Sequence, residues 1–146
     1  VNSSLTTLWL ASNSIGAAGA QALAEALRVN SSLTTLGLGG NSIGAAGAQA
    51  VAAALPAGLT QLSLHFCECD IGDEGAQALA KALEVNTSLT MLGLRSNSIG
   101  GAGAQALAAA LPAGLSSAAA SRADLSSAPL RAARSGASEG TPWPPS

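Results

Sequence analysis

The amino-acid sequence predicts an α/β fold, a right-handed solenoid in which short parallel strands form one layer and helices the other. Residues 28–59 and 84–115 are identical at 25 of their 32 paired positions. A finer pattern, Leu-x-x-Leu-x-Leu-x-x-Asn followed by Ile-Gly-x-x-Gly, recurs four times with changes in its third copy. A repeat of this period is typical of solenoids, in which each unit buries its apolar face only against its neighbours. The four copies, called units one to four, begin at Leu5, Leu33, Leu59 and Leu89.

Within each unit, the first half is expected to form a strand and the second half a helix. The leucines of the first half alternate with other residues, as in a short strand with one buried face. In the second half of unit one, a helical stripe with a spacing of four residues is formed by Ile15, Gly19, Leu23 and Leu27. Alternating strands and helices predict a parallel sheet with helical crossovers.

The links from each helix to the next strand explain why the units differ in length. Counting a fifth start at Leu115, successive units begin 28, 26, 30 and 26 residues apart. A longer link occupies residues 28–33, and a shorter Pro-Ala-Gly-Leu link occupies residues 56–59 and 112–115. Pro and Gly end the preceding helix in the shorter form.

This pattern resembles the leucine-rich repeats of the ribonuclease-inhibitor type, and the resemblance covers about residues 1–115. The resemblance implies a horseshoe with parallel strands on its concave face and helices on its convex face. Similar arrays form the sensor end of NACHT-domain receptors, and similar repeats occur in Ran GTPase-activating proteins. Alternating unit lengths also resemble the ribonuclease-inhibitor arrangement.

Two residue types that recur at fixed places in the units have structural interpretations. The glycines at 19, 47, 75 and 103 are expected where a helix and a strand approach closely. Asn13, Asn41 and Asn97 follow the strands, where an amide satisfies backbone groups of adjacent coils. Replacing Asn41 by Ala is therefore expected to cost about 1–3 kcal/mol of stability.

Composition limits the function classes. A chain of 146 residues suits one domain, and a net charge of −2 with 10% charged residues offers no stripe for nucleic acid. The longest apolar run, around residues 50–59, is too short to cross a bilayer, so no membrane association is expected. Two cysteines without a partner pattern indicate a reducing compartment, and hence a cytoplasmic location.

The two ends of the chain depart from the repeat. Residues 1–115 are expected to form the array of about four repeats, starting in the middle of a longer one, because residues 1–5 match the link at residues 29–33. Its first strand would be an uncapped edge, which favours edge-to-edge self-association. Residues 116–146, rich in Pro, Ser and Ala, are interpreted as a degenerate fifth repeat or cap and a disordered tail.

The candidate binding residues lie between the buried leucines of the strands, where side chains point to the concave face in this family. Trp9 is expected beside Gly37, which would leave its ring uncovered on one side, and His65 beside Arg95. Exposed Trp and Arg are residue types that anchor protein interfaces. The predicted partner-binding residues are Trp9, Gln61, His65, Met91 and Arg95.

Unit three differs from the other units by an insertion of two residues, within the run His65-Phe66-Cys67-Glu68-Cys69-Asp70. Counting from the strand puts Cys67 at the Asn position, whereas counting back from Ile71 puts Cys69 there. His65, Cys67, Cys69 and Asp70 are metal-ligating types, but without a second cysteine pair a structural or inserted loop is favoured over a metal or redox site. Asp73 and Glu74, at the helix start, are interpreted as helix electrostatics.

The sequence thus predicts a module that binds a protein partner through its concave strand face, within a larger receptor or scaffold. It offers no catalytic constellation, so no enzyme and no cofactor are expected. One alternative is a GTPase-activating protein of the Ran type, which a GTP-hydrolysis assay would test. The other is a fragment of a longer array without a function of its own.

Overall fold

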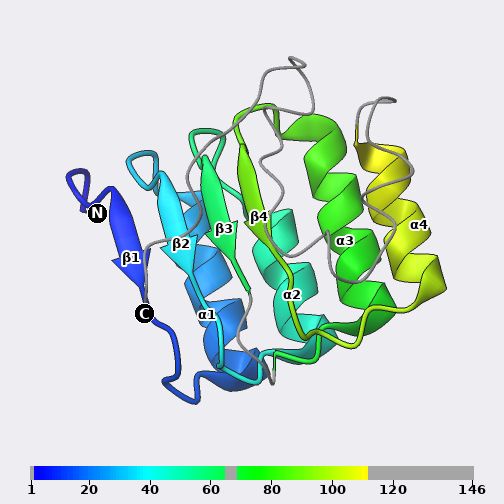
Figure 1. The fold of residues 1–146 in the computed structure, drawn as a ribbon. Coiled ribbons are helices and arrows are strands. Elements are labelled where there is room, and N and C mark those ends of the chain that lie inside the picture. The colour runs from blue at the N-terminus through cyan, green and yellow to red at the C-terminus, as the bar shows by residue number, and fades with distance from the viewer. Residues whose placement is uncertain (1, 65–68, 112–146) are drawn as a thin grey trace.

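The computed structural model describes residues 2–64 and 69–111, in which strand and helix alternate four times (Figure 1). The strands are β1 (Thr7–Trp9), β2 (Thr35–Gly37), β3 (Gln61–Ser63) and β4 (Met91–Gly93). The helices are α1 (Gly16–Arg28), α2 (Gly44–Ala53), α3 (Gly72–Val85) and α4 (Gly101–Ala110). The predicted α/β solenoid is confirmed. The predicted division at residue 115 and the tail at 116–146 lie outside the described residues.

The four strands form one parallel sheet in chain order, and the helices all lie on one side of it (Figure 1). The register aligns one leucine from each strand in a single row, formed by Leu8, Leu36, Leu62 and Leu92. Leu36 and Leu62, in the two inner strands, are fully buried against the helical layer. The core therefore runs continuously between the sheet and the helices.

The helices pack closely because a glycine replaces a side chain near the start of each. A Cβ on Gly47 would lie 2.8 Å from Ile43 Cβ and 3.0 Å from Ala20 Cβ of α1. A Cβ on Gly75 would meet Ile71 and Ala48 in the same way. The expectation that these glycines face a strand is wrong. They lie against the preceding isoleucine and the neighbouring helix, because the helices stack side by side.

Asn41 joins two coils of the solenoid, as predicted. Its side-chain amide nitrogen donates to Leu10 O at 2.7 Å and to Leu38 O at 2.8 Å. Its amide oxygen accepts from the backbone N–H groups of Asn13 at 2.9 Å and Ile15 at 3.3 Å. This fully buried side chain satisfies polar backbone groups that no helix or strand could pair.

A ladder of threonine hydroxyls, which the sequence interpretation missed, also joins the units. Thr34 Oγ1 donates to Thr6 O at 3.1 Å, Thr60 Oγ1 to Thr34 O at 3.1 Å, and Thr90 Oγ1 to Thr60 O at 3.0 Å. Each carbonyl also accepts the backbone N–H of the same threonine. The threonine that follows the first leucine of every unit was the feature of the sequence that could have predicted this ladder.

Candidate functional site: the concave strand face

The candidate site is the face of the sheet that points away from the helices, called here the concave face. The outward side chains form rows that run across the paired strands. Neighbours within a row lie on adjacent strands, which are about 4.8 Å apart. One row runs through Thr7, Thr35, Gln61 and Met91. The next row runs through Trp9, Gly37, Ser63 and Gly93.

Trp9 lies beside Gly37, as predicted from the alternation of the strands. A Cβ added to Gly37 would overlap the Cε3 and Cζ3 atoms of the indole, so the ring leans over the backbone of β2. Only a glycine at this place lets the ring lie down on the sheet. The side chain keeps 45% of its surface exposed, which makes it the largest exposed apolar group on the concave face of the described residues.

The structure spreads the other predicted site residues over the same face. Gln61 and Met91 are neighbours in one row and are both half-buried, whereas Arg95 follows β4 and is exposed. His65 lies outside the described residues. Trp9 stands on β1, three strands away from Met91, which is about 14 Å at the usual strand spacing. These residues form a broad surface and not a compact pocket.

The centre of the concave face is more buried than the sequence indicated. Ser63 is 3% exposed and Thr35 is 9% exposed, although both point away from the helices. Trp9 and Thr7, on the edge strand β1, are exposed. The sequence could not predict this difference in burial, because all four residues occupy outward positions in the alternating pattern of a strand.

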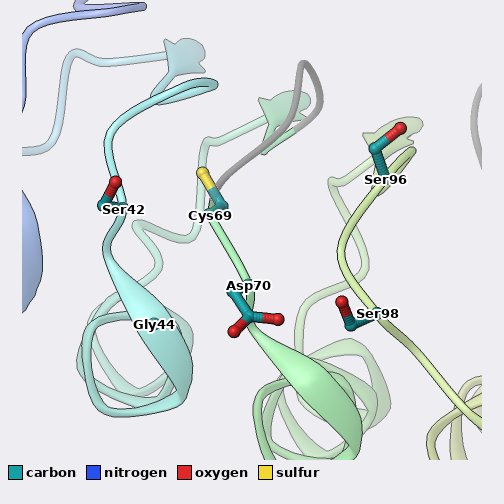
Figure 2. Close-up of a pocket in the computed structure, with 6 residues that line it drawn as sticks. All are labelled: Ser42, Gly44, Cys69, Asp70, Ser96 and Ser98. Carbon is teal, nitrogen blue, oxygen red and sulfur yellow. The ribbon is translucent and has the colours of Figure 1, made fainter.

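A shallow groove borders the concave face where the loops after the strands turn into the helices (Figure 2). Its volume is about 680 Å³, and it is lined by Ser42, Gly44, Cys69, Asp70, Ser96 and Ser98. Three of these residues, at equivalent places in units two, three and four, have left-handed backbones: Ser42 with φ 48°, Asp70 with φ 41° and Ser98 with φ 54°. The groove thus follows from the repeated bend, which exposes short polar side chains.

Cys69 resolves the ambiguity in the register of unit three. Its sulfur lies 3.5 Å from Leu38 O, and its side chain is 1% exposed. Its backbone carbonyl accepts the N–H of Gly44 at 2.7 Å, just as the carbonyl of Asn41 accepts that of Gly16 at 2.8 Å. Cys69 therefore occupies the Asn position, as the count back from Ile71 predicted. Cys67 lies outside the described residues.

A family model described as Leucine Rich repeat matches residues 1–24, 29–52, 59–80 and 85–108. The chain belongs to the leucine-rich-repeat family. Repeats of this family are generally protein-interaction modules and are typically non-enzymatic. The ribonuclease-inhibitor type stays a prediction, since the match gives the family alone. A search of curated proteins finds no match to this chain.

Asp73 has a role between leucine-rich repeats that the sequence interpretation missed. It lies in the first turn of α3, as expected, but its carboxylate reaches the start of α4. Oδ1 accepts the backbone N–H of Gly100 at 2.7 Å and that of Gly103 at 2.9 Å. A carboxylate at a helix start pairs N–H groups that have no partner within that helix. Asp73 therefore holds the start of the helix in the next leucine-rich repeat.

The chemistry of the described surface is that of contact and hydrogen bonding. No three His, Cys, Asp or Glu side chains come together as a metal site within residues 2–64 and 69–111. In the same two ranges, no helix is both long and apolar enough to cross a membrane. The concave face offers an aromatic ring, half-buried Gln61 and Met91, and the exposed cation of Arg95.

Proposed function

We propose that this chain binds a protein partner through its concave strand face, as part of a larger receptor or scaffold. The observation that carries the proposal is the Trp9 ring, which leans on Gly37 and stays 45% exposed. An indole held against backbone loses little conformational freedom when a partner covers its other side. Aromatic anchors of this kind contribute a large share of binding energy in protein interfaces.

The rest of the concave face supports a partner with an extended or gently curved surface. The row through Gln61 and Met91 combines an amide with a flexible apolar side chain. Arg95 adds a guanidinium group, which can form bidentate hydrogen bonds with a carboxylate. These groups span about 14 Å between the outer strands. A surface of this width suits a protein segment better than a small molecule, which prefers a closed cavity.

The test is a pull-down from cell lysate with quantitative mass spectrometry, using the full chain and two matched triple variants. The first variant carries three changes on the concave face: Trp9→Ala, Gln61→Ala and Arg95→Ala. The second carries three changes at exposed positions on the convex helices: Gln49→Ala, Gln77→Ala and Gln105→Ala. Circular dichroism must first show that all three proteins are equally folded. The proposal expects a partner that the parent and the convex variant retain and that the concave variant loses. Retention by both variants would contradict it.

Two finer parts of the proposal have their own tests. Self-association through the edge of β1 is supported by the 42% exposure of Leu5 beside that strand, and light scattering over a concentration series would measure it. A cytoplasmic location rests on the cysteine count alone, and localisation of a tagged chain would test it. GTPase activation of the Ran type stays an alternative, and we propose no residue for it.

A further inference from the structure

The orientation of the Trp9 indole is set by the residue beside it on the next strand. A Cβ on Gly37 would overlap Cε3 and Cζ3 of the ring and would lie 3.1 Å from Cδ2. Gly37 is itself buried, although it has no side chain and stands on the outward side of β2. With one face of the ring over this glycine, the indole presents its other face outward, and 45% of the side chain stays exposed.

The two strands that carry this indole have no charged side chain. The outward residues of β1 and β2 are Thr7, Trp9, Thr35 and Gly37. Acidic residues of the described ranges lie on α1, at the bend of unit three and on α3: Glu25, Asp70, Asp73, Glu74 and Glu84. A cation can pack on an indole face, but here it would lose water without gaining a carboxylate on either strand. An uncharged apolar group therefore suits this ring better.

We propose that the concave face recognises an extended, proline-rich segment of its protein partner, with one proline ring packed on the outward face of Trp9. This inference rests on the proposed function, because it names the chemistry of the partner at the same site. Proline-rich segments are extended before they bind, so they lose little conformational entropy. Gly37 likewise fixes the indole before binding, which lowers the cost of ordering on the side of this chain.

The spacing of side chains along β1 matches such a segment. Thr7 and Trp9 point to the same side of the sheet, and both are exposed. Residues two apart in a strand are separated by about 6.6 Å, and two residues of a polyproline II helix advance by about 6.2 Å. The carbonyls of that helix have no internal hydrogen bonds. A segment that runs along β1 therefore places a proline on Trp9 and a carbonyl near the Thr7 hydroxyl, which can donate to it.

Trp9 fluorescence in the full chain tests the proposal, with an oligoproline peptide as the probe. Every protein carries Trp143→Phe, so that Trp9 is the only tryptophan. Gly37→Ala is the test variant, because its Cβ would displace the ring. Gly58→Ala is the matched control, since a Cβ there would come no closer than 4.0 Å to Ser31 O. Neither glycine has a left-handed backbone, and circular dichroism must show that all the proteins are equally folded.

Oligoproline should shift the Trp9 emission to shorter wavelength and protect the ring from acrylamide, in the parent and in Gly58→Ala. Gly37→Ala should bind the peptide about 2- to 12-fold more weakly, the cost of ordering one side chain on binding. Without peptide, acrylamide should quench Trp9 more strongly in Gly37→Ala than in the parent, which a loss of stability alone would not cause.

Three outcomes would overturn the proposal. The first is that oligoproline has no more effect on the parent than a glycine–serine peptide of the same length. The second is that Gly37→Ala binds oligoproline as tightly as Gly58→Ala does. The third is that an oligoarginine peptide protects the ring and oligoproline does not, which would assign the indole face to a cation.

If Gly37→Ala alters the circular dichroism, Trp9→Phe and Trp9→Leu take its place. Binding is then measured by the fluorescence polarisation of labelled oligoproline. Trp9→Phe keeps an aromatic face and should retain binding, whereas Trp9→Leu should lose it. Loss in both variants or retention in both would contradict packing on an aromatic face.

The peptide experiment and the pull-down can fail separately. Capture of a partner through the concave face without binding of oligoproline overturns the recognition of proline and leaves the function supported. Binding of oligoproline at Trp9, with a lysate partner that both triple variants retain, contradicts the function and leaves the recognition supported. If both hold, excess oligoproline should release the captured partner, and a partner that stays bound would overturn the assignment of its contact to Trp9.

Discussion

The bend at Asn41 in unit two and the bend at Cys69 in unit three occupy the same place in the fold but are held very differently. Asn41 accepts backbone N–H groups of unit one and donates to carbonyls on both coils. Cys69 is equally buried, yet its thiol makes only a 3.5 Å contact with Leu38 O. A thiol is a weak donor and lacks an amide oxygen to accept N–H groups. Units with similar sequences are therefore not expected to be equally stable.

The joint between unit three and unit four also lacks hydrogen bonds that the joint made by Asn41 has. By the repeat, the amide oxygen of Asn97 should accept the N–H groups of Cys69 and Ile71. It is buried, and no donor within the described part of the chain bonds it. The joints on both sides of the unit three bend are therefore weaker than the joint made by Asn41. This region is where we expect local opening to begin.

Asn41→Ala should have the largest effect, a loss of about 3 kcal/mol in the free energy of unfolding, because it strands buried backbone groups of two coils. Urea denaturation of the parent and the variant measures it. An unchanged midpoint would show that the amide does not hold the coils together, and the comparison of the two bends would fail.

Asp73→Ala should cost about 1–2 kcal/mol, the usual range for the loss of a helix cap. Unit three makes this additional contact with unit four, whereas unit two carries Ala45 at the same place. Hydrogen exchange should increase first at Gly100, Gly103 and the start of α4. Glu74→Ala is the matched control, since Glu74 is exposed in the same turn. It should cost at most the helix-dipole contribution of about 0.3–1 kcal/mol and leave hydrogen exchange at Gly100 and Gly103 unchanged.

Cys69→Ala should cost only about 1 kcal/mol, because it removes a small buried side chain and one weak donor. The difference from Asn41→Ala, measured in the same urea series, is the sharpest test of the comparison. A cost as large as that of Asn41→Ala would mean that the thiol holds its bend as firmly as the amide does.

The smallest effects are expected from Thr34→Val and Thr60→Val, each about 0.5–1 kcal/mol for the loss of one hydroxyl hydrogen bond. Both hydroxyls donate at 3.1 Å to the preceding threonine carbonyl, so units two and three should lose the same amount. Clearly unequal losses in thermal denaturation would place the difference between the units in their strands as well as in their bends.

Much of the fold could be predicted because the repeat shows its apolar period four times. The alternating leucines predicted the strands and the outward rows, and pairing confirmed the contact of Trp9 with Gly37. The element that packs against each repeated glycine was predicted wrongly. The spacing of the repeat shows which helix face carries small residues, but it does not show which element packs against that face. Gln61, Met91 and Arg95 lie on or beside the expected face, while their role in binding stays a prediction.

The sequence by itself determined the order of strands and helices, the buried leucine rows and the place of Asn41 at a bend, because these follow from local period and residue type. Only the tertiary structure decided that Cys69 fills the Asn position, that Asp73 bonds to the start of α4, and that Ser63 is buried. The physical reason is that each of these outcomes depends on groups in other coils of the chain. Their distances are set by how units of unequal length stack, which no single unit encodes.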